Sequence, residues 1–236
     1  MRNMLAIWRR EFTAYFNSPI AYFVITVFLV LVGVMFFIPF FAQDRVSMRD
    51  FFSLAPFLFV FFAPAITMRL VAEERRSGTL EMLITMPVRD WEAILGKFLS
   101  AFSLLVVALL LTLPYAFSIS AFGDLDWGPV LGGYVGLLLL GSAFLAIGLM
   151  ASSWTENQIV AFVIGLFLSM VFLMLDRFLV FLPDALAPWV EYLSFTSHFR
   201  NAARGVLDSR DVVFFLSVVL MSLFLAFRSL EARRWR

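Results

Sequence analysis

Six long apolar stretches constrain this chain more than any other feature of its sequence. They cover residues 20–41, 54–72, 98–122, 129–153, 158–182 and 212–230. A helix needs about 20 apolar residues to cross the hydrocarbon core of a bilayer, and only helices or closed barrels satisfy all backbone polar groups there. The sequence therefore predicts an all-α integral membrane protein, with residues 1–236 forming one transmembrane domain of six spans.

The composition agrees with this class and excludes several others. The chain is 62% hydrophobic and 15% charged, whereas a soluble domain has about half its residues apolar and about a quarter charged. The formal net charge of +1 gives no general attraction to nucleic acid, so we expect the lipid bilayer and not nucleic acid as a partner. Cysteine is absent and His198 is the sole histidine, which excludes disulfides and thiolate or multi-histidine metal sites.

The distribution of Lys and Arg predicts how the bundle is oriented. With six spans, the N-terminal residues, the connection after the second span and the C-terminal residues share one side of the membrane. About twice as many Lys and Arg lie near these segments as on the other side, and the positive-inside rule places such segments in the cytoplasm. We therefore expect both termini to be cytoplasmic.

The residues before the first span have the pattern of an amphipathic helix. Over 2–17, apolar side chains recur at roughly helical spacing and oppose Arg9, Arg10 and Glu11, and Asn17-Ser18-Pro19 ends the segment. The pattern favours a helix lying in the membrane interface, and the alternative is a plain extension of the first span. In the fourth span, the Gly132-x-x-x-Gly136 spacing predicts close helix packing within the subunit.

The longest charged interruption is the loop over 73–97. Glu73 and Glu74 fall at the C-terminal end of a helix, where the helix dipole disfavours negative charge, and the adjacent Arg75 and Arg76 can offset them. Ser77-Gly78 is expected to end that helix.

The second half of this loop also contains helix signals. A short apolar segment over 79–86 is stopped by Pro87, and Asp90 is a plausible N-cap for the helix that runs into the third span. The pattern indicates two short helices around a tight corner, suited to docking a soluble partner. A solvated connection that only satisfies the topology is the alternative.

Three segments of this region resemble a known family. Residues Glu73–Glu81 (EERRSGTLE), Met86–Arg89 (MPVR) and Leu95–Phe98 (LGKF) resemble the cytoplasmic loop of ABC-2-type transporter permeases. Within that family the chain looks most like the gliding-motility and nitrous-oxide-reductase-maturation branch, and the resemblance covers nearly all of it. It implies a type V exporter-like permease fold in the bacterial inner (cytoplasmic) membrane.

The resemblance also implies partners. The loop would be a coupling helix seated in a separate ATP-binding subunit, present in two copies, which binds the ATP and Mg; no cofactor, metal or catalytic residue is expected in this chain. A second permease copy, identical or not, would complete the pathway. Gly96-Lys97 lacks the rest of a phosphate-binding loop, in line with a non-enzymatic subunit. The coupling residues carried over are Glu73, Glu74, Arg75, Arg76, Gly78, Thr79, Glu81, Pro87 and Arg89.

The segment over 183–211 is long and apolar for an outer loop. It is expected to lie at the extracytoplasmic interface or to re-enter the membrane, as a gate or as a contact for an extracytoplasmic auxiliary subunit. His198 is interpreted as an ordinary exposed residue near Arg200, neither a ligand nor a proton relay. The candidate residues of this segment are Trp189, Tyr192, His198, Arg204 and Gly205.

The function expected is ATP-driven export or mechanical work across the membrane. A secondary transporter is an alternative, although such proteins place ionisable residues at mid-membrane and the span interiors here contain almost none. A membrane scaffold of an assembly or motility complex is another, because the same coupling loop would serve it. An intramembrane protease is disfavoured because the sole histidine lies outside the spans. The cargo is left open.

Overall fold

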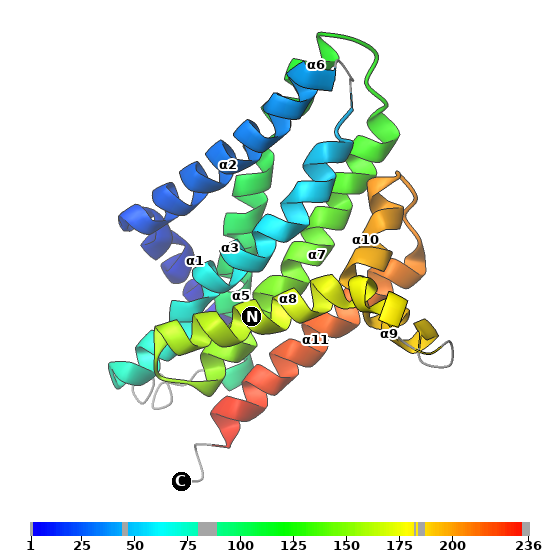
Figure 1. Ribbon diagram of the computed structural model, residues 1–236. Coiled ribbons are helices and arrows are strands. Elements are labelled where there is room, and N and C mark those ends of the chain that lie inside the picture. The colour runs from blue at the N-terminus through cyan, green and yellow to red at the C-terminus, as the bar shows by residue number, and fades with distance from the viewer. Residues whose placement is uncertain (1, 44–46, 80–88, 182, 184–186, 233–236) are drawn as a thin grey trace.

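The computed structural model describes residues 2–43, 47–79, 89–181, 183 and 187–232, and these ranges contain helices but no strand. The helices form one bundle in which the long elements run between two ends (Figure 1). Their bounds are α1 Arg2–Asn17, α2 Pro19–Gln43, α3 Arg49–Arg76, α5 Asp90–Leu110, α6 Leu113–Ser120, α7 Trp127–Trp154, α8 Gln158–Phe178, the 3-10 turn η1 Leu179–Phe181, α9 Ala187–Leu193, α10 Phe195–Ala203 and α11 Ser209–Glu231.

Six of these units are long and apolar enough to cross a membrane: α2, α3, α5 with α6, α7, α8 and α11. The all-α fold with six candidate spans is therefore confirmed. The third is interrupted because Pro114 has no N–H and its ring clashes with the carbonyl of residue 110, four positions earlier. The chain turns at Leu111 and Thr112, where the Thr112 hydroxyl donates to the Leu109 carbonyl at 2.7 Å.

The helix that enters this span starts earlier than its sequence suggested. Asp90 is already the first residue of α5, and Arg89 occupies the N-cap position, so the assignment of Asp90 as the cap was wrong by one residue. The Glu92 carboxylate accepts a hydrogen bond from the Arg89 backbone N–H at 3.3 Å, which satisfies one of the N–H groups that a helix start leaves unpaired.

Helix α3 runs without interruption through Pro56 and Pro64 and is longer than the stretch 54–72. At its middle the neighbouring helices come unusually close. A Cβ atom on Gly165 of α8 would lie 3.2 Å from the Pro64 Cβ and 3.4 Å from the Gly148 Cα of α7. Glycine at these two positions therefore allows three backbones to meet at one point.

Helix α7 is the central element of the bundle and is the most buried of the candidate spans. Its glycines receive side chains from the helices around it. A Cβ on Gly136 would lie 2.6 Å from the Ala202 Cβ of α10, and one on Gly132 would lie 2.7 Å from the Ala202 carbonyl oxygen. The Gly132–Gly136 pair thus packs within this chain, as predicted.

An amphipathic helix, α1, forms over the predicted residues and ends at the Asn17-Ser18-Pro19 break. It packs chiefly against α5 and also contacts α2 and α3. The Trp8 indole donates to the Ser103 hydroxyl of α5 at 2.9 Å, and the buried Tyr15 hydroxyl donates to the Ile66 carbonyl of α3 at 3.0 Å. Burial raises the pKa of Tyr15.

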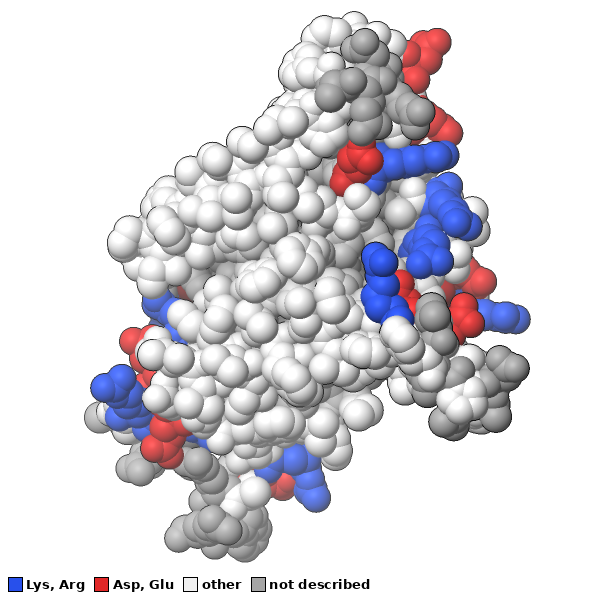
Figure 2. Space-filling model, in the orientation of Figure 1, with Lys and Arg blue, Asp and Glu red and all other residues white. Residues whose placement is uncertain are grey.

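The bundle therefore has two distinct ends. At the α1 end, α1 packs against the N-terminal part of α5, and its Arg10 contacts Glu74 near the C-terminal end of α3. At the α10 end, α10 packs against α7 and α8. Figure 2 shows that charged side chains gather towards the two ends of the visible face, with a wide uncharged surface between them. This distribution fits a chain whose middle lies in hydrocarbon.

Candidate functional site

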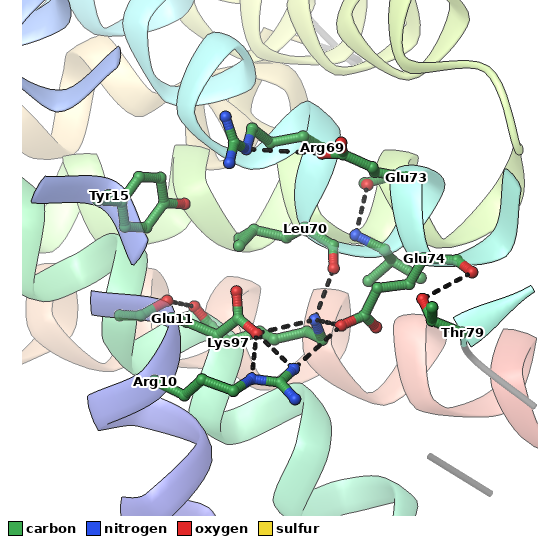
Figure 3. Close-up of polar contacts among 12 residues, drawn as sticks. Arg10, Glu11, Tyr15, Arg69, Leu70, Glu73, Glu74, Thr79 and Lys97 are labelled. Atoms are coloured by element: carbon green, nitrogen blue, oxygen red, sulfur yellow. Dashed lines mark hydrogen bonds and ion pairs between the residues drawn. The ribbon is translucent and has the colours of Figure 1, made fainter. Parts of the chain in front are cut away.

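Four charged residues from three helices meet at the α1 end and form an ion-pair network (Figure 3). Lys97 of α5 reaches Glu74 of α3, with 2.7 Å between Nζ and Oε1, and lies 3.7 Å from the Oε1 of Glu11 in α1. Arg10 of α1 contacts both carboxylates, with Nη2 at 2.8 Å from Glu11 and 3.4 Å from Glu74. We call Arg10, Glu11, Glu74 and Lys97 the tetrad.

The tetrad is electrically balanced and partly removed from water. The Lys97 side chain is only 2% exposed, and its ammonium group also donates to the Leu70 carbonyl at 2.7 Å. A buried charge is tolerated only with partners of this kind. The hydrogen bond to Glu11 raises the pKa of Arg10 against the opposing effect of its partial burial, and the charges of Glu11 and Glu74 add to the increase. Two cations and two carboxylates thus hold three helices together.

The two glutamates at the end of α3 have other counter-ions than those suggested by the sequence. Glu73 pairs with Arg69 one turn earlier, at 3.7 Å, and Glu74 pairs with Lys97 and Arg10. The expectation that Arg75 and Arg76 offset them was wrong for the described ion pairs. Both counter-ions of Glu74 come from other helices and contact its Oε1, whereas its Oε2 is buried without a hydrogen-bond partner among the described residues.

Arg75 and Arg76 have opposite environments. The Arg75 side chain is buried, and its Nη2 donates to the Ser229 hydroxyl of α11 at 3.3 Å. Arg76 is exposed. The predicted coupling residues therefore divide into exposed ones and internal ones that connect helices.

Helix α3 ends where Ser77-Gly78 predicted. The Ser77 hydroxyl donates to the Glu73 carbonyl at 2.9 Å, and Gly78 has a φ of +70°, a left-handed conformation that favours glycine. Thr79 is exposed, with its hydroxyl 2.9 Å from that of Ser77. Arg89 is exposed at the start of α5. Glu81 and Pro87 lie outside the described residues, as does most of the predicted segment 79–86.

A small pocket of about 140 Å³ lies beside the tetrad, between α1 and the end of α3. Glu11, Tyr15, Arg69, Glu73 and Thr79 are among the residues that line it. Its walls are mainly polar and belong to both α1 and the exposed end of α3.

Sequence reasoning missed that Arg10, Glu11 and Lys97 act together. The signal available was Lys97, a lone charge that opens a long apolar run. Such a residue needs a partner once its helix is packed, but nothing in the sequence identified Glu74 or α1 as the source.

At the α10 end, the environment of His198 corrects our interpretation. It is buried and not exposed: its Nδ1 lies 2.6 Å from the Asp211 Oδ1, its Nε2 lies 2.9 Å from the Tyr192 carbonyl oxygen, and its ring stacks on Phe214 with centroids 4.0 Å apart. Asn201 donates to the second Asp211 oxygen at 3.1 Å. These contacts join α10, the end of α9 and the start of α11.

The other candidates of this segment have different surroundings. Trp189 and Tyr192 of α9 are exposed, as is Arg204, which lines a cavity at this end. Gly205 has a φ of +86°, and a Cβ there would lie 3.0 Å from the backbone of Gly128 and Pro129. Glycine is therefore required for the turn after α10 to pass the start of α7.

Comparison with known proteins agrees with this architecture. The family described as ABC-2 family transporter protein matches residues 43–227. Over 136 residues, 58% of this chain, the sequence is 29% identical to the "Probable multidrug ABC transporter permease YbhR" of Escherichia coli K12, and it matches the protein of that name from E. coli O157:H7 equally well. The aligned region spans 36% of those relatives. Because the family match covers most of the six-helix bundle, this chain belongs to the ABC-2 family of transporter proteins.

Proposed function

We propose that this chain is the membrane-spanning permease subunit that couples ATP hydrolysis by a separate ATPase subunit to export or mechanical work. In the proposed complex, two ATPase copies bind the ATP and Mg, and a second permease copy, identical or not, completes the pathway. The α1 end faces the cytoplasm, with both termini there, in a bacterial inner membrane. The tetrad is the observation that carries the proposal, because it joins α1 to both flanks of the loop between α3 and α5.

The exposed and internal residues of this end suit two different tasks. Glu73, Arg76 and Thr79 are exposed and would contact the ATPase. Glu74 and Lys97 are held inside the bundle and would transmit a displacement of the loop to α3 and α5 together. A nucleotide-driven change needs contacts that differ between two states of the complex. The exposed charges of Glu73 and Arg76 would provide such contacts with the ATPase.

The test uses the full chain assembled with its ATPase in lipid nanodiscs. Arg76→Glu reverses an exposed charge next to the loop, so we expect at least a tenfold loss of the ATPase stimulation that the permease produces. Arg9→Glu makes the same change at an exposed position on α1 and should leave the stimulation within about twofold. Insertion and thermal stability should be unchanged in both. Full stimulation by Arg76→Glu would overturn the proposal.

The proposal also covers the kind of work performed and the partner on the outer side. The likeness to the gliding-motility and nitrous-oxide-reductase-maturation branch favours mechanical work, and the name of the E. coli relatives favours drug export. The exposed Trp189 and Tyr192 offer aromatic surface to an extracytoplasmic subunit. The same coupling residues serve either outcome.

A further inference from the structure

A cavity of about 680 Å³ opens at the α10 end, between α3, α8 and α10. Four arginines line it: Arg49 from the start of α3, Arg177 from the end of α8, and Arg200 and Arg204 from the α10 region. In Figure 2, basic side chains gather on the side of the molecule where α10 and the neighbouring helix ends lie. Among the described residues of this end, Arg210 is the one further basic residue.

Most of the arginines of this cavity have no ion-pair partner among the described residues. Asp176 is the one carboxylate among the described residues that line it, and its Oδ2 lies 3.5 Å from the Nη2 of Arg200. Arg49, Arg177 and Arg204 form no ion pair with any described residue. Several guanidinium groups around one cavity repel one another, and an anion placed between them offsets this electrostatic repulsion.

Apart from Ser53 and Thr196, the rest of the cavity is apolar. Phe52, Pro56 and Phe57 line it from α3, and Leu173 and Met174 line it from α8. A volume of about 680 Å³ lies within the range of small-molecule sites, roughly 300–1,000 Å³. A free inorganic anion would leave this apolar surface unoccupied, whereas a ligand with an anionic head and a hydrocarbon tail covers both parts.

We propose that this cavity binds an anionic amphiphile, such as a lipid or an alkyl phosphate. The headgroup lies among Arg49, Arg177 and Arg204, and the tail lies along the apolar side chains of α3 and α8. Guanidinium groups bind phosphate through two parallel hydrogen bonds. The binding does not depend on the ATPase, so it stands or fails separately from the coupling proposed above.

The test measures binding to the full chain, purified in neutral maltoside micelles, by native mass spectrometry. One arm titrates phosphatidylglycerol against phosphatidylcholine with the same acyl chains, and the other titrates dodecyl phosphate against dodecanol. We expect each anionic probe to bind at least tenfold more tightly than its neutral counterpart, and less tightly as salt is raised. Binding of phosphatidylglycerol alone identifies a bilayer lipid as the source, and binding of dodecyl phosphate alone identifies a free amphiphile.

Variants separate this site from non-specific attraction. Arg177→Gln combined with Arg204→Gln should weaken binding of the anionic probe about tenfold, and Ser53→Glu, which places a carboxylate on the cavity wall, should weaken it similarly. Arg210→Gln, outside the cavity, should have less than a twofold effect. Equal affinities for anionic and neutral probes, or equal losses in the cavity variants and Arg210→Gln, would overturn the proposal.

Discussion

The Glu74–Lys97 ion pair should contribute measurably to the free energy of unfolding, and removing Glu74 should cost more than removing Lys97. Lys97 is almost fully buried, whereas the Glu74 side chain is 17% exposed and also has Arg10 at 3.4 Å. Breaking a fully buried ion pair costs about 3–5 kcal/mol. Lys97→Met leaves Glu74 with Arg10 and some water, so it should lower the free energy of unfolding by about 2 kcal/mol.

Glu74→Gln should be the more costly change. It leaves the buried Lys97 ammonium group with the Leu70 carbonyl and with Glu11 at 3.7 Å, and we expect a loss of about 3 kcal/mol. The variant with both substitutions removes both charges, so neither is left without the other. It should therefore lose about 3 kcal/mol of unfolding free energy and not the sum of the two losses. The coupling energy is then about 2 kcal/mol, in the range found for contacting residues.

The measurement is a double-mutant cycle on the full chain, unfolded reversibly by dodecyl sulfate in mixed micelles and followed by far-ultraviolet circular dichroism. The more exposed Arg69–Glu73 pair on α3 serves as a control, with an expected coupling energy below about 1 kcal/mol. Additive losses at Glu74 and Lys97, within about 0.5 kcal/mol, would refute the reasoning that this pair holds α3 to α5.

Three further predictions concern packing, the α10 end and topology. Gly136→Ala should lower the free energy of unfolding by about 1–3 kcal/mol, measured in the same assay, because a methyl group there clashes with α10; a neutral effect would contradict the close approach. Asp211→Asn weakens the hydrogen bond to His198 and should cost about 2 kcal/mol, and an unchanged stability would show that this pair does not anchor α10. For the proposed orientation, a maleimide that cannot cross the membrane should label Asp124→Cys and not Thr79→Cys in intact cells, and the reverse pattern would invert the topology.

The sequence was sufficient for the features that depend on local chemistry. Apolar length predicted six candidate spans. The breaks at Asn17-Ser18-Pro19 and Ser77-Gly78 were predicted because proline after polar residues and a left-handed glycine commonly end helices, although α3 continues through Pro56 and Pro64. The interruption near Pro114 depends on the same chemistry, but it falls inside an apolar run. Hydropathy alone merged α5 and α6 into one stretch.

The candidate sites could be predicted only in part because their partners are distant in sequence. Glu74 was expected to pair with its neighbours, yet its counter-ions lie on α1 and α5. His198 was expected to be exposed because it lies near Arg200 in an outer segment, yet it is buried and contacts Asp211 at the start of α11. In both cases tertiary packing decides the environment of the side chain.

The close approach at Pro64 gives α3 the geometry of a lever with a pivot. The helix has 28 residues and so is about 42 Å long, and the point where Pro64 meets Gly148 and Gly165 lies near its middle. A tilt of about 5° around that point would move each end by roughly 2 Å, in opposite directions. One of those ends bears Glu74 and the other bears Arg49, so a force applied at the tetrad would change the width of the arginine-lined cavity without any relay of side chains between them.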